Sequence, residues 1–159
     1  MAVLLNIPFE AVEIIVEPDG SSGGGAIVYG PEGSRRFRGS RGDSAFVDGL
    51  DAHLRVYLAG KIAEDLAAEQ QAAGPRTPPP SWLAGMEGDR QNIVRMLDAL
   101  HPRDEAAQHC RCDVAIASCR DQLRAFWSAV EAVATALVQQ RRVISSQVRA
   151  IVRARGGKS

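Results

Sequence analysis

A long apolar stripe in the middle of the chain constrains the fold more than any other feature. From about Ala45, apolar residues recur at steps of three and four: Val47, Leu50, Leu54, Leu58, Ile62 and Leu66. This spacing places all of these side chains on one face of an α-helix of roughly six turns. A helix with such a face is stable when other elements cover the face, so the stripe predicts helical packing.

Further helical patterns follow the stripe. A second helix is predicted from near Asp89 to His101, with Ile93, Met96, Leu97 and Leu100 on its apolar face. A third is predicted over 103–140, with a possible break near 110–113. Its inner face would carry Val114, Leu123, Phe126, Trp127, Val130, Val133, Ala134 and Leu137. Ser145 or Ser146 is expected to cap a last short helix.

The segments around these helices read as strands and loops. Ala11–Val16 and Ala26–Tyr29 are rich in β-branched residues and are separated by turn and glycine residues, which predicts a β-hairpin. Residues 31–43 and the proline-rich stretch 70–85 are predicted to be loops. The fold class is therefore mainly α: a helical bundle with a small N-terminal β-hairpin. We expect one domain over residues 1–159, with the hairpin and loop in 1–43 and the bundle in 44–159.

The composition limits which partners and which cellular compartment we expect for this protein. The 19 basic and 19 acidic residues cancel, so we expect no nucleic-acid partner. No uninterrupted apolar run reaches the roughly 18 residues that a spanning helix needs, which predicts no membrane span. The three cysteines leave an odd thiol under any pairing. A secreted disulfide framework is therefore disfavoured, and we expect a cytoplasmic protein.

The cysteines form a candidate metal cluster with His109. On one helix His109 and Cys112 share a face, but Cys119 lies roughly 10 Å beyond Cys112 along the axis. That distance is too long for one tetrahedral zinc. The spacing therefore favours buried structural thiols over a metal site.

Two short motifs resemble the peptidase domain of FtsH-type zinc proteases, which are coupled to AAA+ ATPases. Residues 59–66, Ala-Gly-Lys-Ile-Ala-Glu-Asp-Leu, resemble the Gly-Gly-Arg-x-Ala-Glu-Glu segment of that family. Residues 85–89, Gly-Met-Glu-Gly-Asp, resemble the Gly-Ala-x-Asn-Asp that opens a later helix. The turn at Leu5–Glu10, the hairpin after it and the last helix at Val143–Ile151 are also similar to the family in type and order.

The resemblance implies roles for several residues. Asp89 falls where the family places its third zinc ligand, and Glu64 falls where a carboxylate would help to orient the ligands. A polypeptide substrate would be held as an added strand along the hairpin edge, at Ala26, Ile27, Val28 and Tyr29. Without the resemblance, Asp89 is a helix cap and Glu64 belongs to a solvated helix face.

The departures from the family are as informative as the matches. Hydrolysis by this route needs His-Glu-x-x-His, in which two histidines hold zinc and the glutamate is the general base. The sequence contains no such motif, and His53, His101 and His109 are too scattered to replace it. We therefore assign no catalytic residue in this chain. Zinc is expected only if an upstream segment supplies the motif.

Two hypotheses remain. In the first, the chain is the incomplete proteolytic domain of an ATP-dependent zinc metalloendopeptidase whose His-Glu-x-x-His helix precedes Met1. In the second, it is a shortened, non-catalytic pseudopeptidase that acts as a scaffold or protein-interaction module. The expected partner is accordingly a polypeptide substrate or another protein, and an oligomer is possible. Whether the chain is an enzyme stays open.

Overall fold

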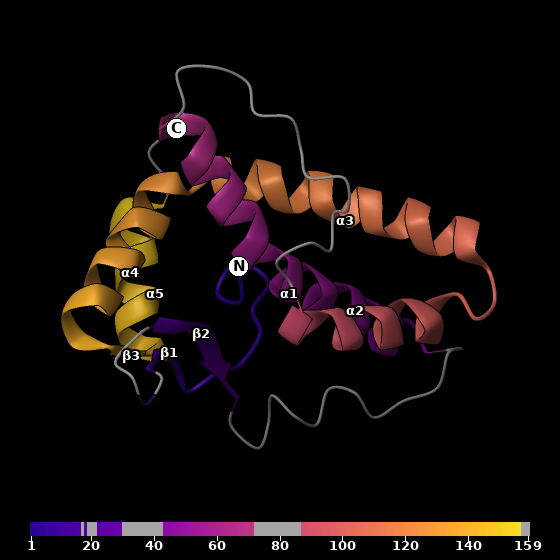
Figure 1. Cartoon of the computed structure of the whole chain (residues 1–159), viewed down its shortest axis with the longest axis horizontal. Coiled ribbons are helices and arrows are strands. Elements are labelled where there is room, and N and C mark those ends of the chain that lie inside the picture. The colour runs from indigo at the N-terminus through magenta and orange to yellow at the C-terminus, as the bar shows by residue number, and fades with distance from the viewer. Residues whose placement is uncertain (17, 19–21, 30–42, 72–86, 157–159) are drawn as a thin grey trace. The chain divides into compact units, whose positions relative to one another are not determined.

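A computed structural model describes residues 1–16, 18, 22–29, 43–71 and 87–156 of the chain. The described part is mainly helical with a small antiparallel sheet (Figure 1), as the sequence predicts. Its elements are, in order, β1 (Ala11–Val16), β2 (Ser22–Val28), α1 (Ser44–Gln71), α2 (Glu87–Leu100), α3 (Glu105–Ala125), α4 (Trp127–Gln140), β3 (Arg142–Ile144) and α5 (Ser145–Arg155). The loop predicted over 31–43 falls, except for residue 43, outside the described residues. Of the loop predicted over 70–85, only residues 70 and 71 are described, and they belong to α1.

The chain divides into two compact units. One contains Met1 and residues 37–124, and therefore α1, α2 and nearly all of α3. The other contains residues 2–36 and 125–159, and therefore the sheet with α4 and α5. The last two helices thus group with the strands and not with α1 and α2.

The first unit is organised by the apolar face of α1. Five residues of the predicted stripe are buried: Leu50, Leu54, Leu58, Ile62 and Leu66. Helix α2 packs against α1 and buries Ile93, Met96 and Leu97 (Figure 1). The stripe is thus confirmed. The helix is 28 residues long, more than the predicted six turns, because Ala67 to Gln71 are good helix formers and continue it.

The predicted third helix is two helices. Helix α3 ends at Ala125 and α4 begins at Trp127, so the break predicted near 110–113 is wrong. Phe126 between them is not helical, with φ −111° and ψ 22°. Its ring lies against Gly156 at the end of α5. This contact joins residues that are distant in sequence, so helical periodicity does not reveal it.

The inner face predicted for this region is correct only in part. Helix α3 buries Cys112, Ala115, Cys119 and Leu123, at steps of three and four. Of the predicted residues in α3, Leu123 is therefore correct, but Val114 is 61% exposed because it lies off this stripe. Ala134 in α4 is also exposed, whereas Val130, Val133 and Leu137 are half-buried. Ala129 is the buried residue of α4.

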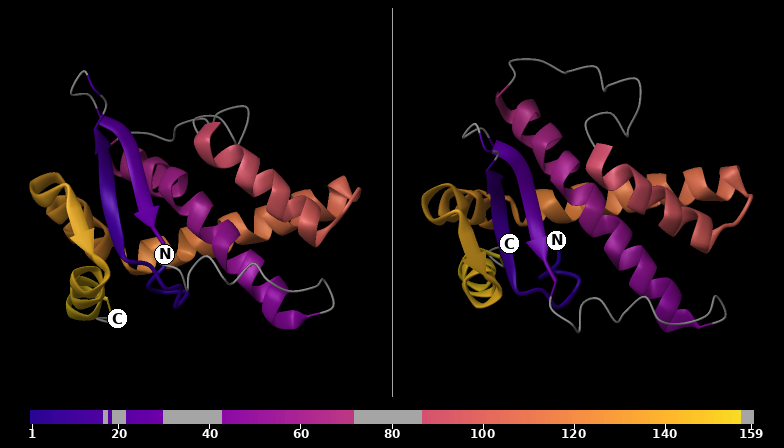
Figure 2. Two further views of the ribbon diagram at one scale, coloured as in Figure 1. Left: turned by 90° about the horizontal axis from the view of Figure 1, so that it is seen from below. Right: turned by 60° about the horizontal axis from the view of Figure 1, so that its bottom comes forward.

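The sheet of the second unit has the order β2-β1-β3, with antiparallel neighbours (Figure 2). Val12 of β1 lies opposite Ile27 on one side and Val143 on the other. The hairpin is predicted, but its second strand is Ser22–Val28 and not Ala26–Tyr29, because the glycines at 23–25 pair with β1. The strand β3 is not predicted, because three residues give too short an alternation to recognise. Val143 is fully buried in it, and α4 contacts both β1 and β3.

The start of α5 differs from the prediction. Ile144 precedes the helix as its N-cap, so neither Ser145 nor Ser146 is the cap. The backbone N–H of Ser145 donates to Glu10 O at 2.8 Å, and the N–H of Ile144 donates to Gln147 Oε1 at 3.0 Å. The pairing of β3 with β1 therefore fixes where the helix begins. Among the helices of the described residues, none is long and apolar enough to cross a membrane.

Two glycines provide a matched test of this packing. A Cβ on Gly156 would lie 2.5 Å from the Phe126 ring and 2.6 Å from Val152 O, so Gly156→Ala must displace the ring. We expect the substitution to lower the free energy of unfolding by about 1–3 kcal/mol, measured by urea denaturation.

The control is Gly60→Ala in α1. A Cβ on Gly60 meets nothing within 4 Å among the described residues, and alanine is the better helix former. This variant should gain about 0.5–1 kcal/mol of stability. A Gly156→Ala variant as stable as the original chain would contradict the contact between α5 and Phe126.

Candidate functional site

The candidate site is centred on Asp89, in the first turn of α2. Its carboxyl is half-buried, and burial raises its pKa above the usual range. Tyr57 of α1 lies near it: burial, and then the negative charge of Asp89, raise the pKa of the Tyr57 phenol. No lysine or arginine of the described residues makes an ion pair with Asp89. Within the described part of the chain, Asp89 is thus a half-buried acid that no basic side chain compensates.

Asp89 alone does not make a zinc site. A zinc site in a protein needs three or four protein ligands. Within the described ranges, no group of three or more histidine, cysteine, aspartate or glutamate side chains could hold a metal. His101 lies at the far end of α2 from Asp89, and His109 is exposed on α3. The described residues therefore contain one carboxyl, that of Asp89, at a position where the resemblance implies a ligand, and they do not fit zinc by themselves.

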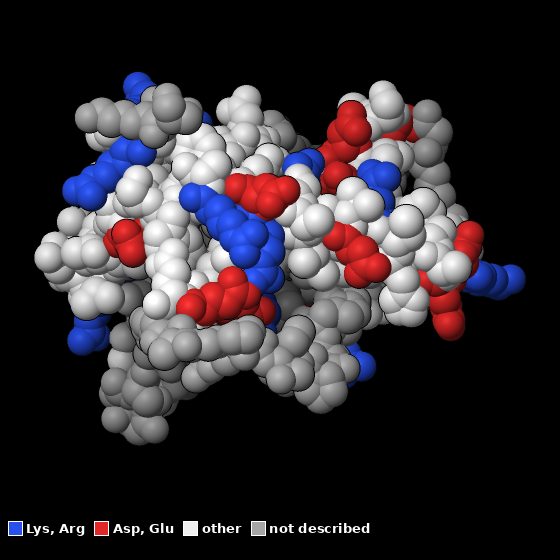
Figure 3. Space-filling view, turned by 90° about the horizontal axis from the view of Figure 1, so that it is seen from above, with Lys and Arg blue, Asp and Glu red and all other residues white. Residues whose placement is uncertain are grey.

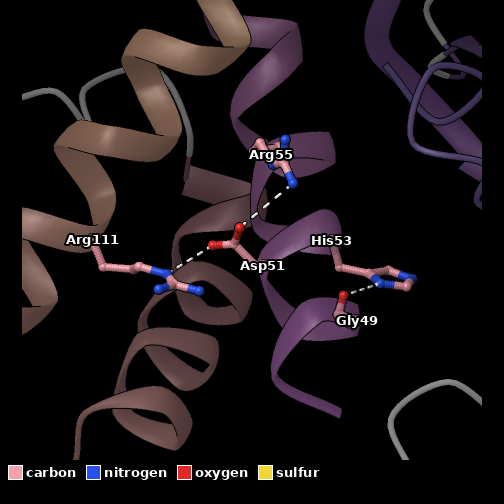
Figure 4. Close-up of polar contacts among 5 residues, drawn as sticks. All are labelled: Gly49, Asp51, His53, Arg55 and Arg111. Carbon is pink, nitrogen blue, oxygen red and sulfur yellow. Dashed lines mark hydrogen bonds and ion pairs between the residues drawn. The ribbon is translucent and has the colours of Figure 1, made fainter. Parts of the chain in front are cut away.

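The side chain of His53 is buried and hydrogen-bonded within its own helix. It is 1% exposed on α1, and its Nδ1 lies 2.8 Å from the carbonyl oxygen of Gly49 one turn earlier (Figure 4). A carbonyl oxygen accepts only, so Nδ1 carries the proton and donates it to this bond. This hydrogen bond ties the His53 ring to the backbone of its own helix.

Glu64 lies on the same face of α1 as Tyr57, two turns further along. It is exposed, and it makes no ion pair with any described residue. Lys61 lies between the two and pairs with Asp65, with Nζ 2.5 Å from Oδ1. The charge of Lys61 is therefore compensated within α1, whereas the carboxylate of Glu64 faces solvent.

The predicted substrate edge belongs to β2. Ala26, Ile27 and Val28 lie in this strand, Tyr29 follows it, and all four are half-buried. The sheet order leaves one side of β2 without a neighbouring strand in the described residues. In β1 the N–H of Ile14 donates to Arg141 O, so the backbone groups of Ile14 point toward β3. Those of Glu13, the residue before it, therefore point the other way, toward the backbone groups of its partner Ala26 in β2. The backbone groups of Ile27 therefore point outward, toward the open edge.

Among the described residues, the cysteines belong to no cluster of three or more side chains that could hold a metal. Cys112 and Cys119 are buried, as predicted, but Cys110 is exposed. Burial raises the pKa of the Cys112 thiol to about 12 and that of Cys119 to about 11. The Cys119 thiol lies 3.7 Å from Arg55 O, to which it can donate. Burial therefore favours the neutral thiol at both positions.

Sequence reasoning missed Tyr57 and the ion pairs that connect α1 with α3. Asp51 Oδ1 accepts from Arg111 Nε at 2.9 Å, and its Oδ2 lies 3.5 Å from a guanidinium nitrogen of Arg55 (Figure 4). Further along α1, Glu69 pairs with Arg120 and Arg124. Of these pairs, Asp51–Arg55 has the four-residue spacing that gives a signal in the sequence, as Lys61–Asp65 also does. Acidic and basic side chains are accordingly interspersed on the face drawn in Figure 3.

The thiols allow a direct test of burial. Near neutral pH, iodoacetamide should alkylate Cys110 rapidly, whereas Cys112 and Cys119 should react only after unfolding, as peptide mapping by mass spectrometry would measure. The protonated thiol of Cys112 favours the folded chain below a pH of about 9, and this contribution is lost as the pH rises toward about 12.

The urea-unfolded chain is the control, in which the three thiols should react at similar rates. Equal rates for Cys110 and Cys112 in the folded chain would contradict the burial of Cys112.

A comparison with protein-family models and with curated proteins found no match for this chain.

Proposed function

We propose that this chain is a domain of the FtsH-type zinc-peptidase class. In this proposal it supplies the helical scaffold, one metal-binding carboxylate and a strand edge for a polypeptide. It does not hydrolyse peptides with the residues of this sequence alone. The observation that carries the proposal is the half-buried carboxyl of Asp89, which lies near Tyr57 and has no cationic partner among the described residues.

The environment of Asp89 supports a role as a ligand. A carboxylate that loses part of its hydration is unstable unless a cation or hydrogen-bond donors compensate it. The described basic residues of α1 and α3 pair with other carboxylates instead. A bound cation would compensate the charge of Asp89. Its position inside the first turn, third in α2, also disfavours the simpler interpretation as the cap before the helix.

The proposed site lacks several residues that peptide hydrolysis would require. Zinc, when bound, activates a water molecule for attack on a peptide carbonyl. Two histidines and a general base would have to come from outside this sequence, because it contains no His-Glu-x-x-His. The role of Asp89 is to hold the metal, and the role of Glu64 is to orient the ligand groups. Neither residue can replace the base.

A second candidate function needs no metal. The outer side of β2 offers the backbone N–H and C=O of Ile27 to an incoming strand. An extended segment of another protein could add to the sheet there by main-chain hydrogen bonds. A pseudopeptidase scaffold would keep this edge and lose catalysis. The order of the sheet, which places β2 at an edge, is what favours this alternative.

The zinc content of the native protein distinguishes the peptidase domain from the interaction module. In the native protein isolated from its own cells, we expect one zinc per chain by elemental analysis. Asp89→Asn should weaken zinc affinity by roughly tenfold or more, because amides bind zinc poorly and the site loses a ligand charge. Asp113→Asn, at an exposed position of α3, is the control and should retain the metal.

Native protein without zinc, or an Asp89→Asn variant with unchanged affinity, would refute the peptidase proposal and leave the interaction module. The intact mass of the same preparation shows whether the native chain carries the histidine motif.

The strand edge has its own test. Ile27→Pro should leave the pairing with β1 intact, because the N–H that it removes points outward. We expect binding of carboxymethylated casein, a permanently unfolded polypeptide, to weaken by about tenfold while the circular dichroism spectrum stays unchanged.

Ala26→Pro is the contrasting variant. It removes an N–H that points toward β1 and should destabilise the sheet itself. Casein binding that is unchanged in a folded Ile27→Pro variant would exclude the outer edge of β2 as the binding surface.

A further inference from the structure

The outer edge of β2 lies at the end of an apolar row of side chains. Val143, Val12 and Ile27 lie directly opposite one another in β3, β1 and β2, so their side chains are on the same face of the sheet. Val143 is fully buried, whereas Val12 and Ile27 are half-buried. Among the described strands, none lies beyond Ile27. The row therefore ends at Ile27, with one flank of this side chain not covered by a strand.

The opposite face of the sheet is also uncharged where it reaches β2. Ala26 and Val28 are the residues of β2 on that face, on either side of Ile27 in the sequence. The charged residues of the sheet lie further in, where Arg142 of β3 pairs with Glu13 of β1. These two charges compensate each other, so the pair leaves no uncompensated charge for a group beside β2.

These two properties determine which side chain is favourable beside Ile27. An apolar, β-branched residue there would extend the row by one member and cover the open flank of Ile27, as such cross-strand pairs do within sheets. A carboxylate there would lose part of its hydration against Ile27 and would meet no cation in return. Alternate residues of an added strand point to opposite faces, so the preference concerns the residue on the face of Ile27.

We infer that the edge of β2 selects extended polypeptide segments that place an apolar, β-branched residue such as valine beside Ile27. This selection rests on the strand addition proposed above for the same edge, and it defines the class of segment that the edge accepts. Main-chain hydrogen bonds to Ile27 hold the segment, and the side chain beside Ile27 determines how tightly it binds. Segments with an acidic residue at that position bind weakly.

Competition against fluorescent carboxymethylated casein tests this preference. The competitors are short peptides of one serine- and threonine-rich sequence, whose central residue is valine, threonine or aspartate. Proline at both ends, which cannot donate to a ladder, holds the central residue in register. Valine and threonine differ by a methyl and a hydroxyl group, so their comparison isolates the apolar contact. We expect the valine peptide to compete about threefold better than the threonine peptide, and about tenfold better than the aspartate peptide.

Two matched variants locate the effect. Ile27→Thr removes the apolar end of the row but keeps a β-branched residue and the outward backbone groups, so the advantage of the valine peptide should vanish. Ile144→Thr makes the same change in β3, at an exposed position on the opposite face of the sheet, and should keep the advantage. Circular dichroism of both variants checks that the sheet is retained.

The outcomes separate this selection from strand addition itself. Equal competition by the three peptides with the original chain, or none by any of them, would overturn the inference. So would an advantage of the valine peptide that a folded Ile27→Thr variant retains. Both results leave the strand addition of casein standing. Casein binding that Ile27→Pro does not alter would instead remove strand addition at this edge, and the selection with it.

Discussion

The packing of α2 on the apolar face of α1 is the interaction on which the candidate site depends. Burial of a leucine or isoleucine side chain contributes about 1.5–3 kcal/mol, and this interface buries several from each helix. The packing fixes the orientation of α2, and with it the first turn that carries Asp89. Loss of this packing would move Asp89 away from Tyr57.

The sequence predicts those parts of the fold whose cause is local. The stripe of α1 and the position of α2 follow from periodicity, and the hairpin follows from β-branched runs around a turn. The third strand and the end of α3 have causes that are distant in sequence. Val143 lies in a strand because it pairs with Val12, and α3 ends where the ring of Phe126 meets Gly156. A short stretch of sequence around Val143 does not contain Val12, and one around Phe126 does not contain Gly156.

The same distinction applies to the candidate site. Asp89 and Glu64 could be selected from two short motifs, and the structure places Asp89 at a helix start and Glu64 on the face of α1 that carries Tyr57. Tyr57 itself could not be selected, because its relevance arises from the approach of α2 across an undescribed connection. The pairing of Arg111 with Asp51 was likewise invisible, since sixty positions separate the two residues.

Helix α2 differs from its neighbours in how its charges are treated. Ion pairs compensate the basic side chains of α1 and α3, and such pairs bind the helices together at modest energy. On α2, Asp89 has no ion-pair partner among the described residues. A half-buried carboxylate without such a partner opposes folding, because burial removes part of its hydration. A cation bound at Asp89, as proposed above, would offset this cost.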